Sequence, residues 1–126
     1  MKKWMLLPVL LGLAGCASEV VRYPAELTAV GQQQKRYTTS QSVPLRFDSG
    51  YDRTIMAGTG FVEAGTIKQG TVLKPTNTVL TVEGMHMHEA YLVVQGGRIV
   101  GFYLPADRAF APVTQPVPIT LQERNP

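Results

Sequence analysis

The residues best suited to chemistry lie in the run Met85-His86-Met87-His88-Glu89. Imidazole nitrogens bind zinc or copper, and thioether sulfur favours copper. If the run is a strand, alternation places His86 and His88 on one face, about 7 Å apart at Cα, with Met85, Met87 and Glu89 on the opposite face. A zinc site needs at least one or two further donors, and the sequence contains no other histidine.

The small number of ligands favours a structural interpretation of this run. We expect the two imidazoles to lie on a solvated or hydrogen-bonded face of a sheet, while Met87 fills a gap in the core. We therefore predict no cofactor and assign no metal ligand. A copper or zinc site at His86 and His88 is the alternative.

Serines and carboxylates offer weaker catalytic patterns. No serine is set in the glycine pattern of a nucleophile elbow. Glu83 and Glu89 flank the histidines and could form the acid and base of a glycosidase acting on cell-wall material. Two carboxylates on a β segment are more commonly surface charges, because such catalysis requires a defined separation between them. The sequence therefore predicts a protein that is not an enzyme, with an enzyme or enzyme inhibitor at the cell wall as an alternative.

One polar loop carries an aromatic and a cationic residue close together. Tyr51 and Arg53 follow the turn signal Asp48-Ser49-Gly50. Tyrosine and arginine are enriched at the energetic centres of protein interfaces, although such loops are common on surfaces. Tyr51 and Arg53 are thus the candidate partner-binding residues, and an ordinary surface turn is the competing interpretation.

The N-terminus carries a targeting pattern. Lys2 and Lys3 precede an apolar stretch over residues 4–14. A stretch of this length is too short to span the hydrocarbon core, which needs roughly 20 apolar residues, and is typical of a removable signal peptide. The stretch leads into the run Leu13-Ala14-Gly15-Cys16, which places small residues directly before the only cysteine.

This run resembles the lipobox of bacterial lipoproteins. The resemblance covers residues 1–18 alone and implies that the Cys16 thiol receives a diacylglycerol. It also implies that signal peptidase II removes residues 1–15 and that the new amine is acylated, commonly with palmitate. Ala17 and Ser18 follow the cysteine where an aspartate would favour retention at the inner membrane. The resemblance therefore implies the periplasmic face of the outer membrane.

The composition of the chain after cleavage predicts a small domain without disulfide bonds. Cleavage before Cys16 would leave 111 of the 126 residues, with 10 basic against 9 acidic side chains, because Lys2 and Lys3 are lost. A charge of +1 without a basic cluster excludes nucleic acid as an expected partner. The only cysteine would carry the lipid, so no internal disulfide can form and the core must suffice alone.

The order of apolar runs predicts the fold. Residues 16–42 are mostly polar and predict a flexible tether, in which residues 24–30 could form at most two marginal turns of helix. Residues 43–126 contain short β-branched and aromatic runs separated by glycine and proline, ending in a proline-rich C-terminal segment. Such spacing predicts an all-β domain, a small antiparallel sandwich or partly open barrel.

The clearest pair of strands flanks Gly96-Gly97. Two glycines accept the positive φ angles of a primed hairpin turn, so residues 89–95 and 98–104 are predicted to pair. Both arms are apolar on both faces, which predicts a central position, and Gly101 is expected to mark a bulge or a close approach. A proline-rich segment follows, and residues 119–122 could add an edge strand.

These observations together predict a lipid-anchored protein of the outer membrane that binds another envelope protein as an accessory subunit. A periplasmic copper- or zinc-binding lipoprotein and a protein acting on, or inhibiting an enzyme of, the cell wall are the alternatives. The sequence alone selects no particular partner.

Overall fold

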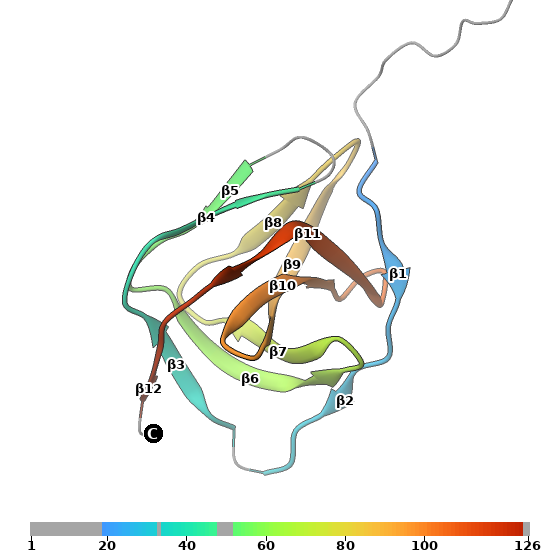
Figure 1. Ribbon diagram of the computed structural model, residues 1–126. Coiled ribbons are helices and arrows are strands. Elements are labelled where there is room, and N and C mark those ends of the chain that lie inside the picture. The colour runs from blue at the N-terminus through green and yellow to red at the C-terminus, as the bar shows by residue number, and fades with distance from the viewer. Residues whose placement is uncertain (1–18, 33, 48–51, 125–126) are drawn as a thin grey trace, which may run out of the picture.

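The computed structural model describes residues 19–32, 34–47 and 52–124, which form twelve β-strands and no helix (Figure 1). Their bounds are β1 Tyr23–Pro24, β2 Thr28–Ala29, β3 Arg36–Thr39, β4 Val43–Arg46, β5 Asp52–Ile55, β6 Gly60–Ile67, β7 Gly70–Pro75, β8 Leu80–Glu83, β9 Met87–Gln95, β10 Arg98–Leu104, β11 Ala109–Pro118 and β12 Leu121–Arg124.

Ten of these strands form one antiparallel sheet in the order β1-β11-β10-β9-β7-β6-β3-β12, with β2 added beside β6 and β8 beside β9. The long strand β9 pairs with β8 through its first half and with β7 through its second half. The sheet is not closed into a barrel, and β4 and β5 form a separate two-stranded sheet. The predicted all-β class, with antiparallel strands in an open sandwich, is confirmed.

Both faces of the central strands are buried, because their side chains alternate between two apolar clusters. Leu92 and Phe102 belong to the main core, which also contains residues from β4, β5, β8 and β11. Val93 and Tyr103 belong to a smaller cluster on the other face, against which Leu27 of the N-terminal segment packs. The central position predicted for these two strands is thus confirmed.

The predicted Gly-Gly hairpin is present as β9 and β10. Gly96 and Gly97 have φ angles of 61° and 76°, which glycine adopts without the steric cost of a Cβ. The register shifts between Ile99 and Gly101. A Cβ on Gly101 would lie 2.4 Å from the Ala111 carbonyl oxygen, so only glycine allows β11 to approach this closely. The bulge and close approach expected at Gly101 are both confirmed.

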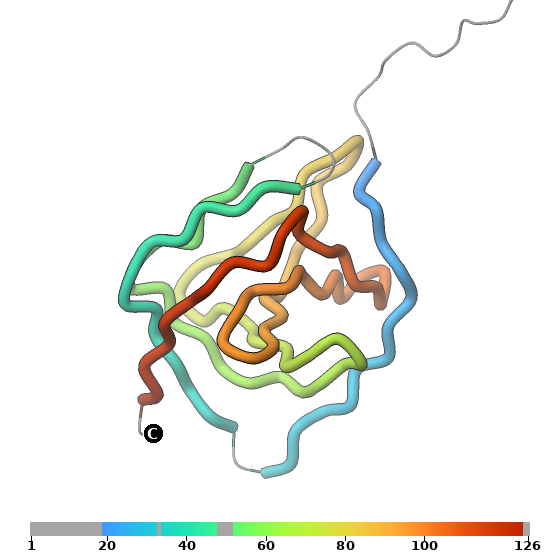
Figure 2. Tube along the Cα trace, in the orientation of Figure 1, coloured from blue at the N-terminus to red at the C-terminus, as the bar shows by residue number. Residues whose placement is uncertain are grey.

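The strand β11 leaves the ladder in its middle. Its register with β10 passes from Ile99↔Val117 to Gly101↔Pro112, so residues 113–116 loop out. Prolines bracket this loop at positions 112 and 116, and proline has no N–H with which to continue a ladder. After the loop the chain returns to β10 and then forms β12, an edge strand paired with β3 (Figure 2).

Residues 19–32 and 34–42 differ from the flexible tether predicted for residues 16–42, of which residues 16–18 and 33 lie outside the described part of the chain. Within this region β1 pairs with β11, β2 pairs with β6, and β3 lies between β6 and β12. Thr39 is 2% exposed, and its hydroxyl donates to the Met56 carbonyl. Residues 24–30 contain the end of β1 and all of β2 in place of the two helical turns. These polar strands pair with segments that are distant in the sequence, and the composition of a short stretch does not reveal such pairing.

Candidate functional site

The predicted site residues fall into two groups. Cys16 and Tyr51 lie outside the described residues, so their predicted roles stay predictions. Arg53, His86 and His88 are described, and the structure places Arg53 on β5, His88 on β9, and His86 in the turn before β9.

The histidines do not form the continuous strand face that alternation suggested. The strand β9 begins at Met87, so His86 lies in the turn and is exposed, while only 14% of the His88 side chain is exposed. Met87 is 66% exposed, so the prediction that it fills a gap in the core was wrong. The reason is that the run coincides with a turn and a strand end, where the core no longer lies beneath the side chain.

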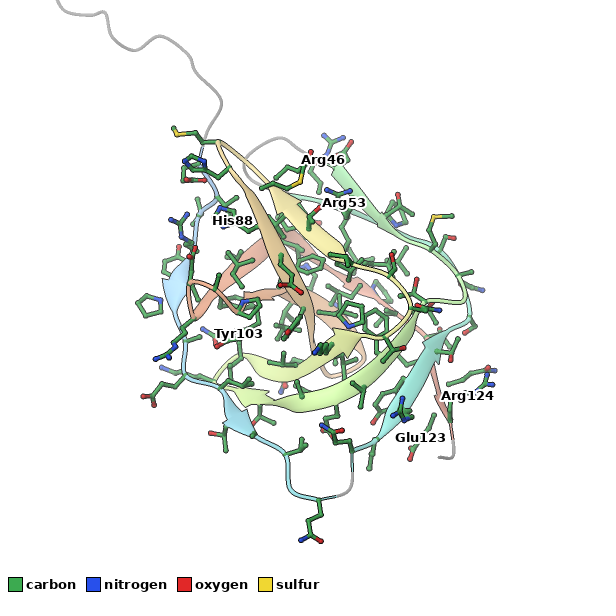
Figure 3. The ribbon with its side chains drawn as sticks, turned by 180° about the vertical axis from the view of Figure 1, so that it is seen from behind. Arg46, Arg53, His88, Tyr103, Glu123 and Arg124 are labelled. Atoms are coloured by element: carbon green, nitrogen blue, oxygen red, sulfur yellow. The ribbon has the colours of Figure 1, made fainter. Side chains whose placement is uncertain are left out.

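His88 lies in a cluster of charged residues that the sequence did not reveal. Its Nδ1 is 3.5 Å from Asp107 Oδ2, and its Nε2 is 3.7 Å from Glu19 Oε1. Arg22 joins the two carboxylates, with its Nε 3.2 Å from Asp107 and its Nη1 3.8 Å from Glu19. Figure 3 shows His88 on the side of β9 that faces the first described residues. The cluster thus connects the N-terminal segment to β9 and to the turn before β11.

The charge state of Glu19 fits this role. The Val20 backbone N–H donates to Glu19 Oε1 at 2.8 Å. This hydrogen bond and, next among the favourable causes, the charge of Arg22 hold the pKa of Glu19 below its usual value. A carboxylate with a lowered pKa stays ionised at neutral pH and attracts the Arg22 guanidinium.

The geometry does not favour a metal ion at this cluster. The two ring nitrogens of His88 face different carboxylates, so Glu19 and Asp107 do not converge on one nitrogen. No group of three histidine, cysteine, aspartate or glutamate side chains suited to a metal ion occurs among residues 19–32, 34–47 and 52–124. His86 and His88 alone supply too few ligands for a zinc site.

Arg53 attaches the β4–β5 hairpin to the main sheet. Its Nε donates to the Thr81 carbonyl at 3.0 Å and one terminal nitrogen donates to the Thr81 hydroxyl at 2.7 Å. The same guanidinium lies 3.1 Å from Glu83 Oε2. Because β5 has no backbone ladder with β8, these bonds to the edge of β8 join the two sheets. Arg53 therefore has a structural role, and Glu83, one of the two carboxylates considered for catalysis, is its ion-pair partner.

A groove of about 480 Å³ lies where the hairpin meets the looped-out part of β11. Residues of β4 and β5 form one wall, and residues of β11 form the other. Arg46 and Asp52 pair at 3.2 Å on the exposed surface of the hairpin. The groove is lined by Pro44, Leu45, Arg46, Asp52, Arg53, Thr54, Thr114, Gln115 and Val117. Its volume is within the range of ligand-binding clefts.

The sequence predicts only part of this groove. Arg53 was selected as a contact residue, but the wall from β11 was missed. The sequence indicates this wall only through Pro112 and Pro116, because two prolines four residues apart interrupt a strand and favour a loop between them. Sequence alone does not tell which part of the chain such a loop will face.

Comparison with known proteins gives no match: no family model, no curated protein and no solved structure is significantly similar to this chain. The described part of the chain contains no helix long and apolar enough to span a bilayer.

Proposed function

We propose that this chain is a lipoprotein anchored by Cys16 to the periplasmic face of the outer membrane, where it binds another envelope protein without catalysing a reaction. The observation that carries this proposal is the groove between the β4–β5 hairpin and β11. Residues from three strands line it, although the hairpin has no backbone ladder with either neighbouring sheet edge. The partner occupies this groove.

The N-terminal pattern supports the location. A basic start, a short apolar stretch and the run ending at Cys16 resemble a lipoprotein signal. Lipid chains contribute about 0.8 kcal/mol per buried methylene, so several chains hold a protein at a membrane where a single chain binds marginally. An anchored domain of this size samples partners within a thin layer at the membrane, which raises their effective concentration.

The chemistry of the groove supports a protein partner. Pro44 and Val117 provide apolar contact, while Thr54 and Gln115 provide hydrogen-bonding groups. Such a mixture resembles the polar and apolar composition of transient interfaces. Prolines in β4 and β11 oppose the addition of a further strand at either edge, because proline lacks the N–H that a ladder needs. The partner is therefore held through side chains and not by strand addition.

Photocrosslinking in intact cells tests the proposal. A photoreactive residue replaces Thr54, which is exposed in the groove, and in a matched variant it replaces Thr66, which is exposed on β6 outside the groove. We expect a discrete crosslinked protein at position 54 and none at position 66. Labelled palmitate should enter both variants and should fail to enter a Cys16→Ser variant.

Two outcomes contradict the proposal. The same products at positions 54 and 66, or none at either, would show that the groove does not select a partner. Absence of palmitate from the wild-type chain would refute the anchor, whatever the crosslinks show.

A further inference from the structure

We propose that the turn between β8 and β9 is a second membrane contact, where Met85 and Met87 rest on the bilayer that holds the lipid on Cys16. This inference rests on the anchor in the proposed function and goes beyond it. It assigns an orientation to the domain and a role to the run Met85-His86-Met87-His88, which is too poor in ligands for a metal site.

Chain length brings this turn to the membrane. Only three peptide steps separate Cys16 from Glu19, and consecutive Cα atoms are 3.8 Å apart. In any conformation the two Cα atoms are therefore at most about 11 Å apart. Glu19 in turn lies 3.7 Å from His88, at the beginning of β9. A lipid on Cys16 thus keeps the first residues of β9 within a short distance of the bilayer surface.

The N-terminal segment is attached firmly enough to transmit this constraint. Val20 is 6% exposed and belongs to the main core. Glu19 and Arg22, on either side of it, join the cluster with His88 and Asp107. Figure 1 shows the first described residues beside the β8–β9 turn, at the same end of the molecule. The domain is therefore held close to its anchor and does not stand off on a long tether.

The turn presents the side chains that a membrane surface accepts. Met85 and Met87 are 57% and 66% exposed, and Val21 of the N-terminal segment is 43% exposed. Burying apolar area contributes about 25 cal/mol per Å², so two methionines give a weak contact by themselves. The lipid makes this contact intramolecular, and a weak contact then suffices. Of the acids nearby, Glu19 is paired with Arg22 and Glu83 with Arg53, which reduces repulsion from anionic lipid headgroups.

A third exposed methionine offers a matched control. Met56 is 61% exposed and follows β5. The Asn77 side chain, just before β8, donates to the Gly58 carbonyl, so Met56 lies near the start of β8. The turn with Met85 and Met87 follows the other end of that strand. Two methionines of similar exposure thus lie at opposite ends of β8.

The experiment places a fluorophore at each position. Lipid on Cys16 leaves an introduced cysteine as the only free thiol, so Met87→Cys and Met56→Cys are labelled separately in the mature lipidated protein. Both are reconstituted into vesicles of phosphatidylethanolamine and phosphatidylglycerol that contain a lipid with a quencher in its headgroup region. We expect loss of most of the fluorescence at position 87 and none at position 56.

A third variant tests the attachment. Glu19→Gln together with Arg22→Gln removes the charges that hold the segment, and we expect recovery of fluorescence at position 87. Equal quenching at positions 87 and 56, or none at either, in protein whose lipid is verified by mass spectrometry would overturn the membrane contact and leave the anchor intact. An unmodified Cys16 thiol would refute the anchor and this inference together, whereas crosslinking at the groove tests only the partner.

Discussion

Two hairpins of this protein are held in opposite ways. The β9–β10 hairpin has a tight glycine turn and hydrogen-bonded neighbours on both sides, with β7 and β8 on one side and β11 on the other. The β4–β5 hairpin pairs only with itself and is attached by buried side chains and by Arg53. A strand can thus pack into the core without forming backbone hydrogen bonds to the main sheet. The groove proposed for a partner lies beside the second hairpin, where the backbone leaves an opening.

The largest expected effect comes from the side chain that connects both hairpins. Phe102 of β10 is fully buried, and its ring centroid lies 5.4 Å from that of Phe47, just after β4. Phe102→Ala removes this contact and leaves a cavity, so we expect a loss of about 4 kcal/mol in the free energy of unfolding. Urea denaturation measures it. A loss below about 1 kcal/mol would show that the two hairpins do not share one core.

A smaller and more local effect is expected at Arg53. Arg53→Met removes two hydrogen bonds to Thr81 and the ion pair with Glu83, so we expect the hairpin to open more readily by about 1–2 kcal/mol. Native-state hydrogen exchange should show faster exchange in β4 and β5 with little change in β9 and β10. Equal acceleration in both hairpins would contradict the distinction between them.

Arg46 supplies the matched control for that variant. Its ion pair with Asp52 lies within the β4–β5 hairpin, and the two side chains are 73% and 64% exposed. Exposed pairs contribute about 0–1 kcal/mol. Arg46→Met should therefore leave hydrogen exchange in both hairpins nearly unchanged.

Apart from the control at Arg46, the smallest effect is expected in the turn of the central hairpin. Gly96 has a φ of 61°, and a Cβ there meets nothing within 4 Å, so Gly96→Ala adds only backbone strain. We expect a loss of about 1 kcal/mol in the free energy of unfolding, measured with urea. Gly31→Ala is the control: its Cβ also meets nothing, and its φ lies outside the left-handed region. Equal losses would show that the turn conformation does not stabilise β9–β10.

Local signals predicted the central hairpin because they lie within a few residues of one another. Gly96 and Gly97 specify the turn, and the apolar pattern on both sides specifies strands that are buried on both faces. Gly101 could be recognised for a similar reason, since a lone glycine in an apolar strand indicates a close approach. In each case the residue that determines the backbone conformation lies within the strand or turn that it shapes.

The candidate site was predicted less completely. Arg53 was selected as a contact residue, and the structure assigns it to the junction with β8. His88 was considered as a ligand, but its partners Glu19 and Asp107 come from segments far away in the sequence. The polar segment around Thr39 was likewise predicted to be a tether. It forms a strand because it pairs with β6 and β12, which are distant in the sequence.

By itself the sequence determined the all-β class and the turn of the central hairpin, because spacing and glycine content act over a few residues. It also carries the N-terminal pattern that resembles a lipoprotein signal. Only the tertiary structure decided that the N-terminal strands cover and extend the sheet, that three charged residues meet around His88, and that a groove opens beside β11. These features depend on pairing between distant segments, whose energy comes from burial and long-range contacts that no local pattern encodes.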